Sequence, residues 1–130
     1  MKVVWNYVAG PAFEHRLAGL TDQGLSVAVC PEADDARLLE LLADAEVLWH
    51  CLRPVDSRLL EAAPRLRLVQ KIGVGVNTID LDTARARNVA VCNMPGTNSR
   101  AVAEHALALM LAVLRQVPRF DADVRAGRGW

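Results

Sequence analysis

Two short segments of this sequence combine residue types that could bind a small carboxylate. The first is KIGVGVNTID at residues 71–80, in which Gly73 and Gly75 bracket a single valine. Glycine lets the backbone approach a ligand closely, and the N–H groups of Val74 and Gly75 can both point at one anion. The second is NMPGTNSRAVAEHALALMLAVLR at residues 93–115, a loop that leads into an apolar helix. A plain turn that needs two glycines is the alternative interpretation of the first segment.

Gly73-Val74-Gly75 also resembles the start of the dinucleotide-binding motif G-x-G-x-x-G. Thr78 occupies the position of the third glycine, and no acidic residue follows a second strand at the expected distance. We therefore expect this turn to bind a carboxylate and not a dinucleotide.

Asn98 precedes the apolar helix and could cap it. Asparagine and serine are both good N-cap residues, so Asn98 and Ser99 compete for the start of the helix. Capping alone is an adequate explanation of Asn98.

The histidines give no clear acid or base. His105 adjoins Glu104, but neighbouring residues point to different faces of a helix, so His105 is expected to be a packing residue. His50, Cys51 and Leu52 end a predicted strand and lie at the edge of the expected crevice.

The chain has three cysteines, Cys30, Cys51 and Cys92, without the spacing of metal ligands. Each closes a predicted strand in an apolar context. Because a free cysteine behaves as a small hydrophobic residue, we expect reduced thiols in the core and no metal site.

Composition limits the class of protein. A chain of 130 residues, 52% of them hydrophobic, can bury its own core. Fifteen basic and fifteen acidic residues balance, which predicts no nucleic-acid partner. The start MKVVWNYV lacks the features of a signal peptide, and the longest apolar run, residues 106–114, is shorter than the ~20 residues that span a bilayer. We expect a cytoplasmic protein without a membrane partner.

Five β-rich runs, at residues 2–8, 25–30, 47–52, 66–72 and 89–92, alternate with helical patterns. Asp34 and Asp80 are predicted N-caps, and Asp56 opens a short helix. This alternation predicts a flavodoxin-like, doubly wound α/β fold with a parallel five-stranded sheet. Loops that follow parallel strands lie at one sheet edge, so residues 73–77 and 93–99 should converge on one crevice.

The last predicted helix, residues 100–116, is apolar almost all round. Such a helix must be covered on more than one side, which leaves apolar surface for another domain or subunit. After Pro118 the sequence RFDADVRAGRGW is polar and glycine-rich, which indicates an arm or linker. We therefore divide the chain into a flavodoxin-like domain at residues 1–98 and an inter-domain or dimerisation helix with an arm at 99–130.

The stretch LRLVQKIGVGVNTIDLDTARARNVAVCNMPGTNSRAVAEHALALMLAVLR, residues 66–115, is similar almost position for position to the substrate-domain signature of the D-isomer-specific 2-hydroxyacid dehydrogenases. LRPVDSRLLEAAPRL, residues 52–66, also resembles this phosphoglycerate dehydrogenase-like family, as does RFDADVRAGRGW. The resemblance implies that Val74 and Gly75 hold the substrate carboxylate and that Asn98 faces the substrate. It also implies that the loop at Leu52 selects the substrate side chain and that Val102 lies near the nicotinamide ring.

In such enzymes a hydride passes between nicotinamide and C2 of a 2-hydroxy or 2-oxo acid. The family's nucleotide fingerprint and its catalytic arginine, acidic residue and histidine come later than residue 130, so the resemblance implies no catalytic residue here. We expect the substrate-binding half of an NAD- or NADP-dependent enzyme that lacks the nucleotide-binding domain. By itself this half should bind no cofactor and have no turnover. Its expected partners are a small 2-hydroxy or 2-oxo acid, the nucleotide-binding half and a second copy in a homodimer. A stand-alone, non-catalytic module for acid binding or dimerisation is the alternative.

Overall fold

The protein was analysed as a computed structural model that describes residues 1–129. Internal contacts divide the chain into two compact units, Met1–Pro95 and the residues from Gly96 onward. The division lies three residues before the one drawn from the sequence. The roles assigned to the two parts stay predictions.

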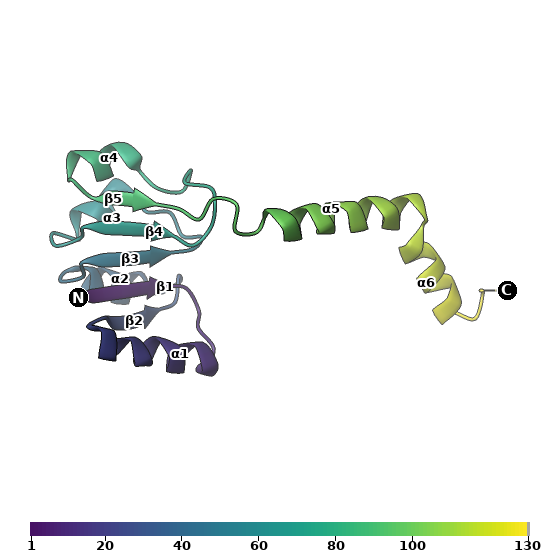
Figure 1. The fold of residues 1–130 in the computed structure, drawn as a ribbon, viewed down its shortest axis with the longest axis horizontal. Helices are drawn as coiled ribbons and strands as arrows, with labels where there is room; N and C mark the ends of the chain where they lie inside the picture. The colour runs from purple at the N-terminus through teal and green to yellow at the C-terminus, as the bar shows by residue number, and fades with distance from the viewer. Residues whose placement is uncertain (130) are drawn as a thin grey trace. The chain divides into compact units, whose positions relative to one another are not determined.

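The first unit is built on a five-stranded parallel sheet (Figure 1). Its strand order is β2-β1-β3-β4-β5, which is the flavodoxin-like order and confirms the predicted fold. The strands are shorter than the sequence indicated, and they run as follows: β1 Lys2–Asn6, β2 Ser26–Cys30, β3 Val47–His50, β4 Leu68–Lys71 and β5 Ala90–Cys92.

Short helices connect the strands, and three of them begin at an aspartate. These helices are α1 (Pro11–Ala18), followed by a 3-10 turn, η1 (Gly19–Gln23), and then α2 (Asp35–Leu42), α3 (Ser57–Glu61) and α4 (Leu81–Ala86). The carboxylates of Asp34, Asp56 and Asp80 accept hydrogen bonds from backbone N–H groups three residues ahead, at 3.0, 2.9 and 3.0 Å. Each bond satisfies an otherwise unpaired N–H group of the first helical turn, so the predicted helix starts are confirmed.

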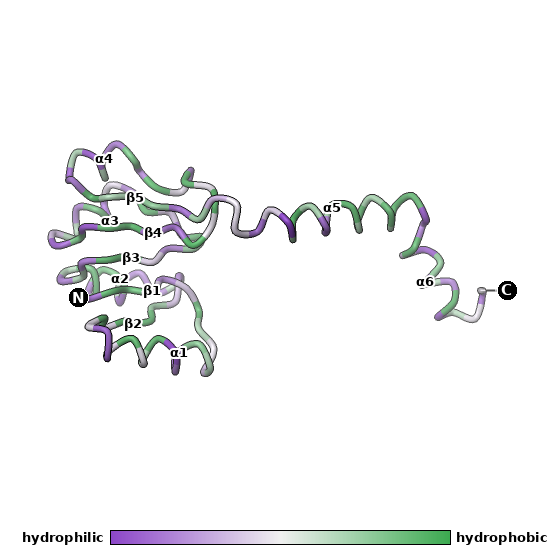
Figure 2. The backbone as a smooth tube through the Cα atoms, viewed as in Figure 1, coloured by the Kyte–Doolittle hydropathy of each residue, from purple (hydrophilic) through white to green (hydrophobic). Residues whose placement is uncertain are grey.

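The core lies between one face of the sheet and the helices α2, α3 and α4. Val4, Leu48 and Val69 are in register on adjacent strands and are fully buried. Buried leucines from α2 and α3 pack in the same cluster. In Figure 2 the strands are coloured mainly as hydrophobic, as expected for a sheet covered on both faces.

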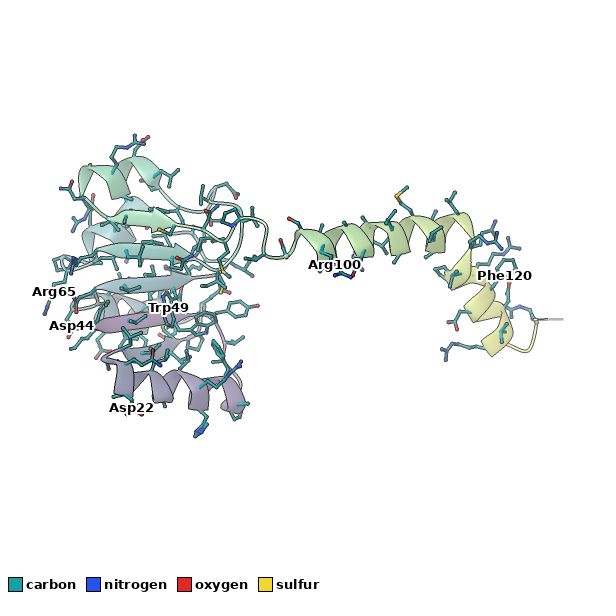
Figure 3. The ribbon with its side chains drawn as sticks, viewed as in Figure 1. Asp22, Asp44, Trp49, Arg65, Arg100 and Phe120 are labelled. Atoms are coloured by element: carbon teal, nitrogen blue, oxygen red, sulfur yellow. The ribbon has the colours of Figure 1, made fainter. Side chains whose placement is uncertain are left out.

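The opposite face of the sheet carries aromatic side chains. Trp5 alternates with Val4 along β1, and its ring lies 5.0 Å from the ring of Phe13 on α1 and 6.4 Å from that of Trp49 on β3. Trp49 is labelled in Figure 3. Helix α1 therefore packs on the face away from the main core, and the sheet is doubly wound as predicted.

The second unit contains two helices, α5 (Ser99–Leu114) and α6 (Val117–Arg125). The stretch after Pro118, predicted as an arm or linker, is helical as far as Arg125, and its role as an arm stays a prediction. Proline lies in the first turn of this helix, where its missing N–H group would have no helical partner in any case. Ion pairs one turn apart, such as Arg125 with Asp121 at 3.0 Å, also suit a helix.

The apolar side chains of α5 are exposed, including Leu107, Leu109 and Met110. No single helix of residues 1–129 has the length and apolar character to cross a membrane. Helices α5 and α6, with a bend of 61° between them, have the length and apolar composition of a membrane span only when they are taken together.

The cysteine prediction was right only in part. Cys30, Cys51 and Cys92 are free, but only Cys30 is buried. Cys51 is half-buried and Cys92 is exposed, because both lie at the ends of strands where the sheet meets solvent. Burial raises the pKa of the Cys30 and Cys51 thiols, so both are protonated near neutral pH.

Candidate functional site

Loops after three neighbouring strands meet at the carboxyl edge of the sheet. The N–H group of Ile72 donates to the carbonyl of His50 at 2.8 Å, which joins the ends of β4 and β3. The N–H group of Met94 donates to the carbonyl of Gly73 at 2.9 Å, and the side-chain amide of Asn93 donates to the carbonyl of Val74 at 2.7 Å. The loop after β5 therefore lies against the turn after β4, as the strand pattern predicted for this part of the crevice.

The turn that begins at Gly73 presents unused backbone donors. Gly73 has a φ of +157°, a conformation that other residues rarely adopt. Val74 is 46% exposed and Gly75 is exposed. Neither Val74 nor Gly75 donates its N–H group to another of residues 1–129, whereas the Val74 carbonyl is held by Asn93. Two adjacent free N–H groups on an anchored turn can bind an anion.

Lys71, at the end of β4, ties this turn to the loop after β3. Its side chain is only 7% exposed. The ammonium donates to the Cys51 carbonyl, to the Thr78 hydroxyl at 3.3 Å and to Nε2 of His50 at 3.3 Å. A Cβ atom on Gly73 would lie 3.4 Å from Cε of Lys71, so the lysine stem runs beside the turn.

His50 is a neutral member of this cluster. Burial, and then the adjacent Lys71 ammonium, lower the pKa of His50 to about 4. An ammonium has hydrogens to give and no lone pair, so Nε2 of His50 is the acceptor in the contact with Lys71, and Nδ1 has no hydrogen-bond partner among residues 1–129. Nε2 also lies 2.9 Å from the Thr78 hydroxyl. A neutral, buried imidazole held in this way positions its neighbours and is not a general base near pH 7.

The loop after β3 is held from a second side by Glu32. Oε1 of Glu32 accepts from the N–H groups of Leu52 and Arg53 at 2.9 and 2.7 Å. These bonds explain why β3 stops at His50, two residues before the predicted end, because the next backbone groups bond to side chains instead of a strand. The side chain of Leu52 is 63% exposed at this edge.

The turn does not fit a dinucleotide. The hydroxyl of Thr78, at the position of the third glycine, is occupied by His50 and Lys71. The next helix, α4, begins with the Asp80 carboxylate on its N-terminal N–H groups, and these hydrogen bonds hold the pKa of Asp80 below its ordinary value. A carboxylate at that helix end repels a pyrophosphate, which binds where helix N–H groups are free.

Asn98 and Val102 belong to the second unit. Asn98 occupies the N-cap position of α5, but its side chain makes no capping hydrogen bond. Capping therefore does not account for its side chain, and Ser99 is the first helical residue. Val102 is exposed on α5, and so is His105, which was expected to be a packing residue.

Sequence reasoning missed Lys71 and Glu32. A signal for Lys71 was present, because a lysine ends an apolar strand immediately before the glycine turn. Glu32 had no such signal, since its partners are 20 and 21 residues away in the chain.

A comparison with protein families decides the assignment. Residues 7–122 match the family described as D-isomer specific 2-hydroxyacid dehydrogenase, catalytic domain. The chain belongs to this family. The D-2-hydroxyacid dehydrogenases are NAD-dependent oxidoreductases, so the resemblance seen in residues 66–115 is confirmed.

Individual D-2-hydroxyacid dehydrogenases show the extent of the similarity. D-3-phosphoglycerate dehydrogenase of Mycobacterium leprae is 39% identical over 120 residues, which are 92% of this chain and 22% of that enzyme. The chain thus spans about a fifth of the length of this curated relative. Among solved structures, a protein from Thermus thermophilus is 30% identical with a TM-score of 0.84, covering 98% of this chain and 41% of that one. NAD-dependent formate dehydrogenase from Staphylococcus aureus, solved in complex with NAD, is 25% identical with a TM-score of 0.83, covering 100% and 43%.

The depressed pKa of His50 predicts a pH-dependent stability. From its ordinary value near 6.5 down to about 4, the unfolded chain binds a proton that the folded protein does not. Stability is therefore complete above about pH 6.5 and falls as the pH is lowered toward 4, by roughly 2 to 3 kcal/mol from this group. Urea unfolding of the wild type and His50→Gln at about pH 7 and about pH 4.5 measures this difference.

His50→Gln should lose this part of the pH dependence. The matched control is His15→Gln, because His15 is exposed on α1, and it should keep the wild-type dependence. Equal pH dependence in the wild type and His50→Gln would contradict the assignment of a buried neutral His50.

Proposed function

We propose that this chain is the substrate-binding part of an NAD(P)-dependent D-2-hydroxyacid dehydrogenase. In this proposal the carboxylate of a 2-hydroxy or 2-oxo acid binds to the N–H groups of Val74 and Gly75. The observation that carries the proposal is the exposed turn after β4, whose two donors are free and whose flanks are anchored by Asn93 and Lys71. Charge-assisted hydrogen bonds to a carboxylate are each worth about 1.5 to 3 kcal/mol when well formed.

Three further residues have proposed roles. Asn98 contacts the substrate, and its freedom from capping supports this role. Leu52 contacts the substituent on C2, in keeping with its exposed position at the same sheet edge. Val102 lies near the nicotinamide ring when the cofactor is bound.

The cofactor is proposed to bind outside residues 1–130. The turn at Gly73 does not fit a pyrophosphate, because the Thr78 hydroxyl is already bonded to Lys71 and the Asp80 carboxylate occupies the start of α4. Hydride transfer to or from C2 then needs a nucleotide-binding domain with its own catalytic groups. The present residues hold and orient the acid, and this chain alone is expected to have no turnover.

Joining this chain at residue 130 to the nucleotide-binding domain of a relative should give NADH-dependent reduction of a 2-oxo acid. In that enzyme Gly75→Pro removes one N–H donor and Asn98→Ala removes a side-chain contact. Each should lower kcat/KM by at least tenfold, or about 1.4 kcal/mol of transition-state stabilisation. Steady-state kinetics with circular dichroism as the folding check would measure this.

Gly75→Ala is the matched control for the proline variant, because it keeps the N–H group. Its Cβ atom would meet only Oδ1 of Asn77, at 2.9 Å, which a side-chain rotation relieves. Wild-type kcat/KM in both Gly75→Pro and Asn98→Ala, with folding intact, would place the carboxylate site elsewhere. Binding of the acid without any turnover in the joined protein would favour the non-catalytic module.

We also propose that the second unit mediates a homodimer. Leu107, Leu109, Met110, Leu111, Val113 and Leu114 are all more than half exposed on α5. Burying several hundred Å² of such surface at roughly 25 cal/mol per Å² gives enough gross driving force for association.

Sedimentation equilibrium should therefore reveal a species heavier than the 14.2 kDa chain, and Leu109→Glu should return it to the monomer. Leu52→Glu places the same charge on an exposed leucine of the first unit and should leave the association unchanged. A 14.2 kDa species alone, at every concentration up to about millimolar, would contradict the dimer.

A further inference from the structure

The two free N–H groups of the turn after β4 belong to peptide units whose carbonyls are already bonded. The Gly73 carbonyl and the Val74 N–H group share one planar unit, and the Val74 carbonyl and the Gly75 N–H group share the next. The backbone N–H group of Met94 donates to the first carbonyl at 2.9 Å, and the side-chain amide of Asn93 donates to the second at 2.7 Å. The loop after β5 therefore contacts both units at their carbonyl ends.

These contacts fix the direction of the free donors. A trans peptide unit directs its C=O and N–H groups to opposite sides, and both units are trans. The two carbonyls point toward the loop after β5, because their donors are successive residues of that loop. The N–H groups of Val74 and Gly75 consequently point away from the loop, on one side of the turn. An anion on that side meets two donors and no carbonyl of these units.

The bonded carbonyls also strengthen the free donors. A hydrogen bond accepted by a carbonyl polarises its whole peptide unit, so the N–H group at the other end becomes a better donor, by about 10 to 30% per bond. Asn93 acts in this way on the Gly75 donor, and Met94 acts on the Val74 donor. A carboxylate gains from the fixed direction and from the larger dipole of each unit.

Asn93 is the part of this arrangement that a substitution can remove. Met94 donates from its backbone, whereas Asn93 donates from an exposed side chain. No backbone N–H group of residues 1–129 donates to the Val74 carbonyl. Without the Asn93 amide this carbonyl has only water as its donor, and water does not fix the plane of the peptide unit.

We propose that Asn93 is a positioning residue, whose side-chain amide orients and polarises the peptide unit of Val74 and Gly75, so that the turn binds a carboxylate fully only while the loop after β5 is docked on it. This rests on the proposed binding of the carboxylate at Val74 and Gly75. It adds a residue that acts on the ligand through another, and a coupling between the ligand and the loop. Because such coupling is reciprocal, a bound carboxylate holds the loop more firmly on the turn.

Gln70 offers a matched control, because it makes the same kind of bond to a peptide unit that no ligand can use. Its side-chain amide donates to the Lys71 carbonyl at 2.9 Å. The N–H group of that unit belongs to Ile72 and is already bonded to the His50 carbonyl. Gln70→Ala therefore removes an amide-to-carbonyl bond next to the turn without changing a free donor.

The first test is a pyruvate titration of the 130-residue chain, followed through its backbone amide signals by NMR. Asn93→Ala and Asn93→Leu should both weaken binding by about fivefold, as expected for the loss of one hydrogen bond. Leucine is close to asparagine in size, so agreement between the two variants assigns the effect to the lost donor. The pyruvate response should fall more at Gly75 than at Val74, whose unit keeps the bond from Met94. Gln70→Ala should bind pyruvate like the wild type.

The second test uses the wild type alone and does not depend on the folding of any variant. Saturating pyruvate should slow the hydrogen exchange of the Met94 amide by about twofold or more, because the ligand favours the docked loop. The amide of Ala84, which bonds to Asp80 inside the core, is the internal reference and should exchange at an unchanged rate.

The outcomes separate this inference from the proposed function. Wild-type pyruvate binding in both Asn93 variants, an equal loss in Gln70→Ala, or an unchanged exchange rate at Met94 overturns the inference and leaves the carboxylate site standing. If pyruvate shifts neither the Val74 nor the Gly75 amide of the wild type, the carboxylate site itself is overturned, and the inference falls with it.

Discussion

The buried ammonium of Lys71 is the constraint on which the candidate site depends. A charge removed from water is unfavourable unless hydrogen bonds satisfy it, and here the acceptors are His50 and Cys51 at the end of β3 and Thr78 in the segment after β4. Satisfying the lysine therefore fixes the Cys51 carbonyl, the His50 ring and Thr78 at one point. The glycine turn beside the lysine stem is held open to solvent with its donors free.

Most of the fold could be predicted from the sequence because the capping residues and the apolar runs indicate the same helices and strands that burial of the core requires. Aspartates before apolar helical patterns became caps, and apolar runs became a parallel sheet in the expected order. The failures occurred where one local signal has two meanings. The polar, glycine-rich stretch after Pro118 gave no sign of helix α6, and Cys92 ends an apolar strand but is exposed.

The candidate site could be located but not assembled from the sequence. The turn at Gly73 has a local signature, and its position after a parallel strand places it at the carboxyl edge. The contacts that hold the neighbouring loop join residues about 20 positions apart, such as Glu32 to Leu52 and Lys71 to Cys51. No periodicity or spacing predicts such pairs, because they arise only when the loops meet in the folded unit. The lowered pKa of His50 could not be predicted either, because it depends first on burial in the folded unit and then on Lys71, which is 21 residues away.

A crystal structure of this chain grown with pyruvate tests the central claim most directly, because it locates the carboxylate without requiring turnover. The proposed site predicts carboxylate oxygens about 2.7 to 3.1 Å from the backbone nitrogens of Val74 and Gly75, with Lys71 still bound to the Cys51 carbonyl. Pyruvate bound at another surface, with the two N–H groups of the turn still free of it, would contradict the claim.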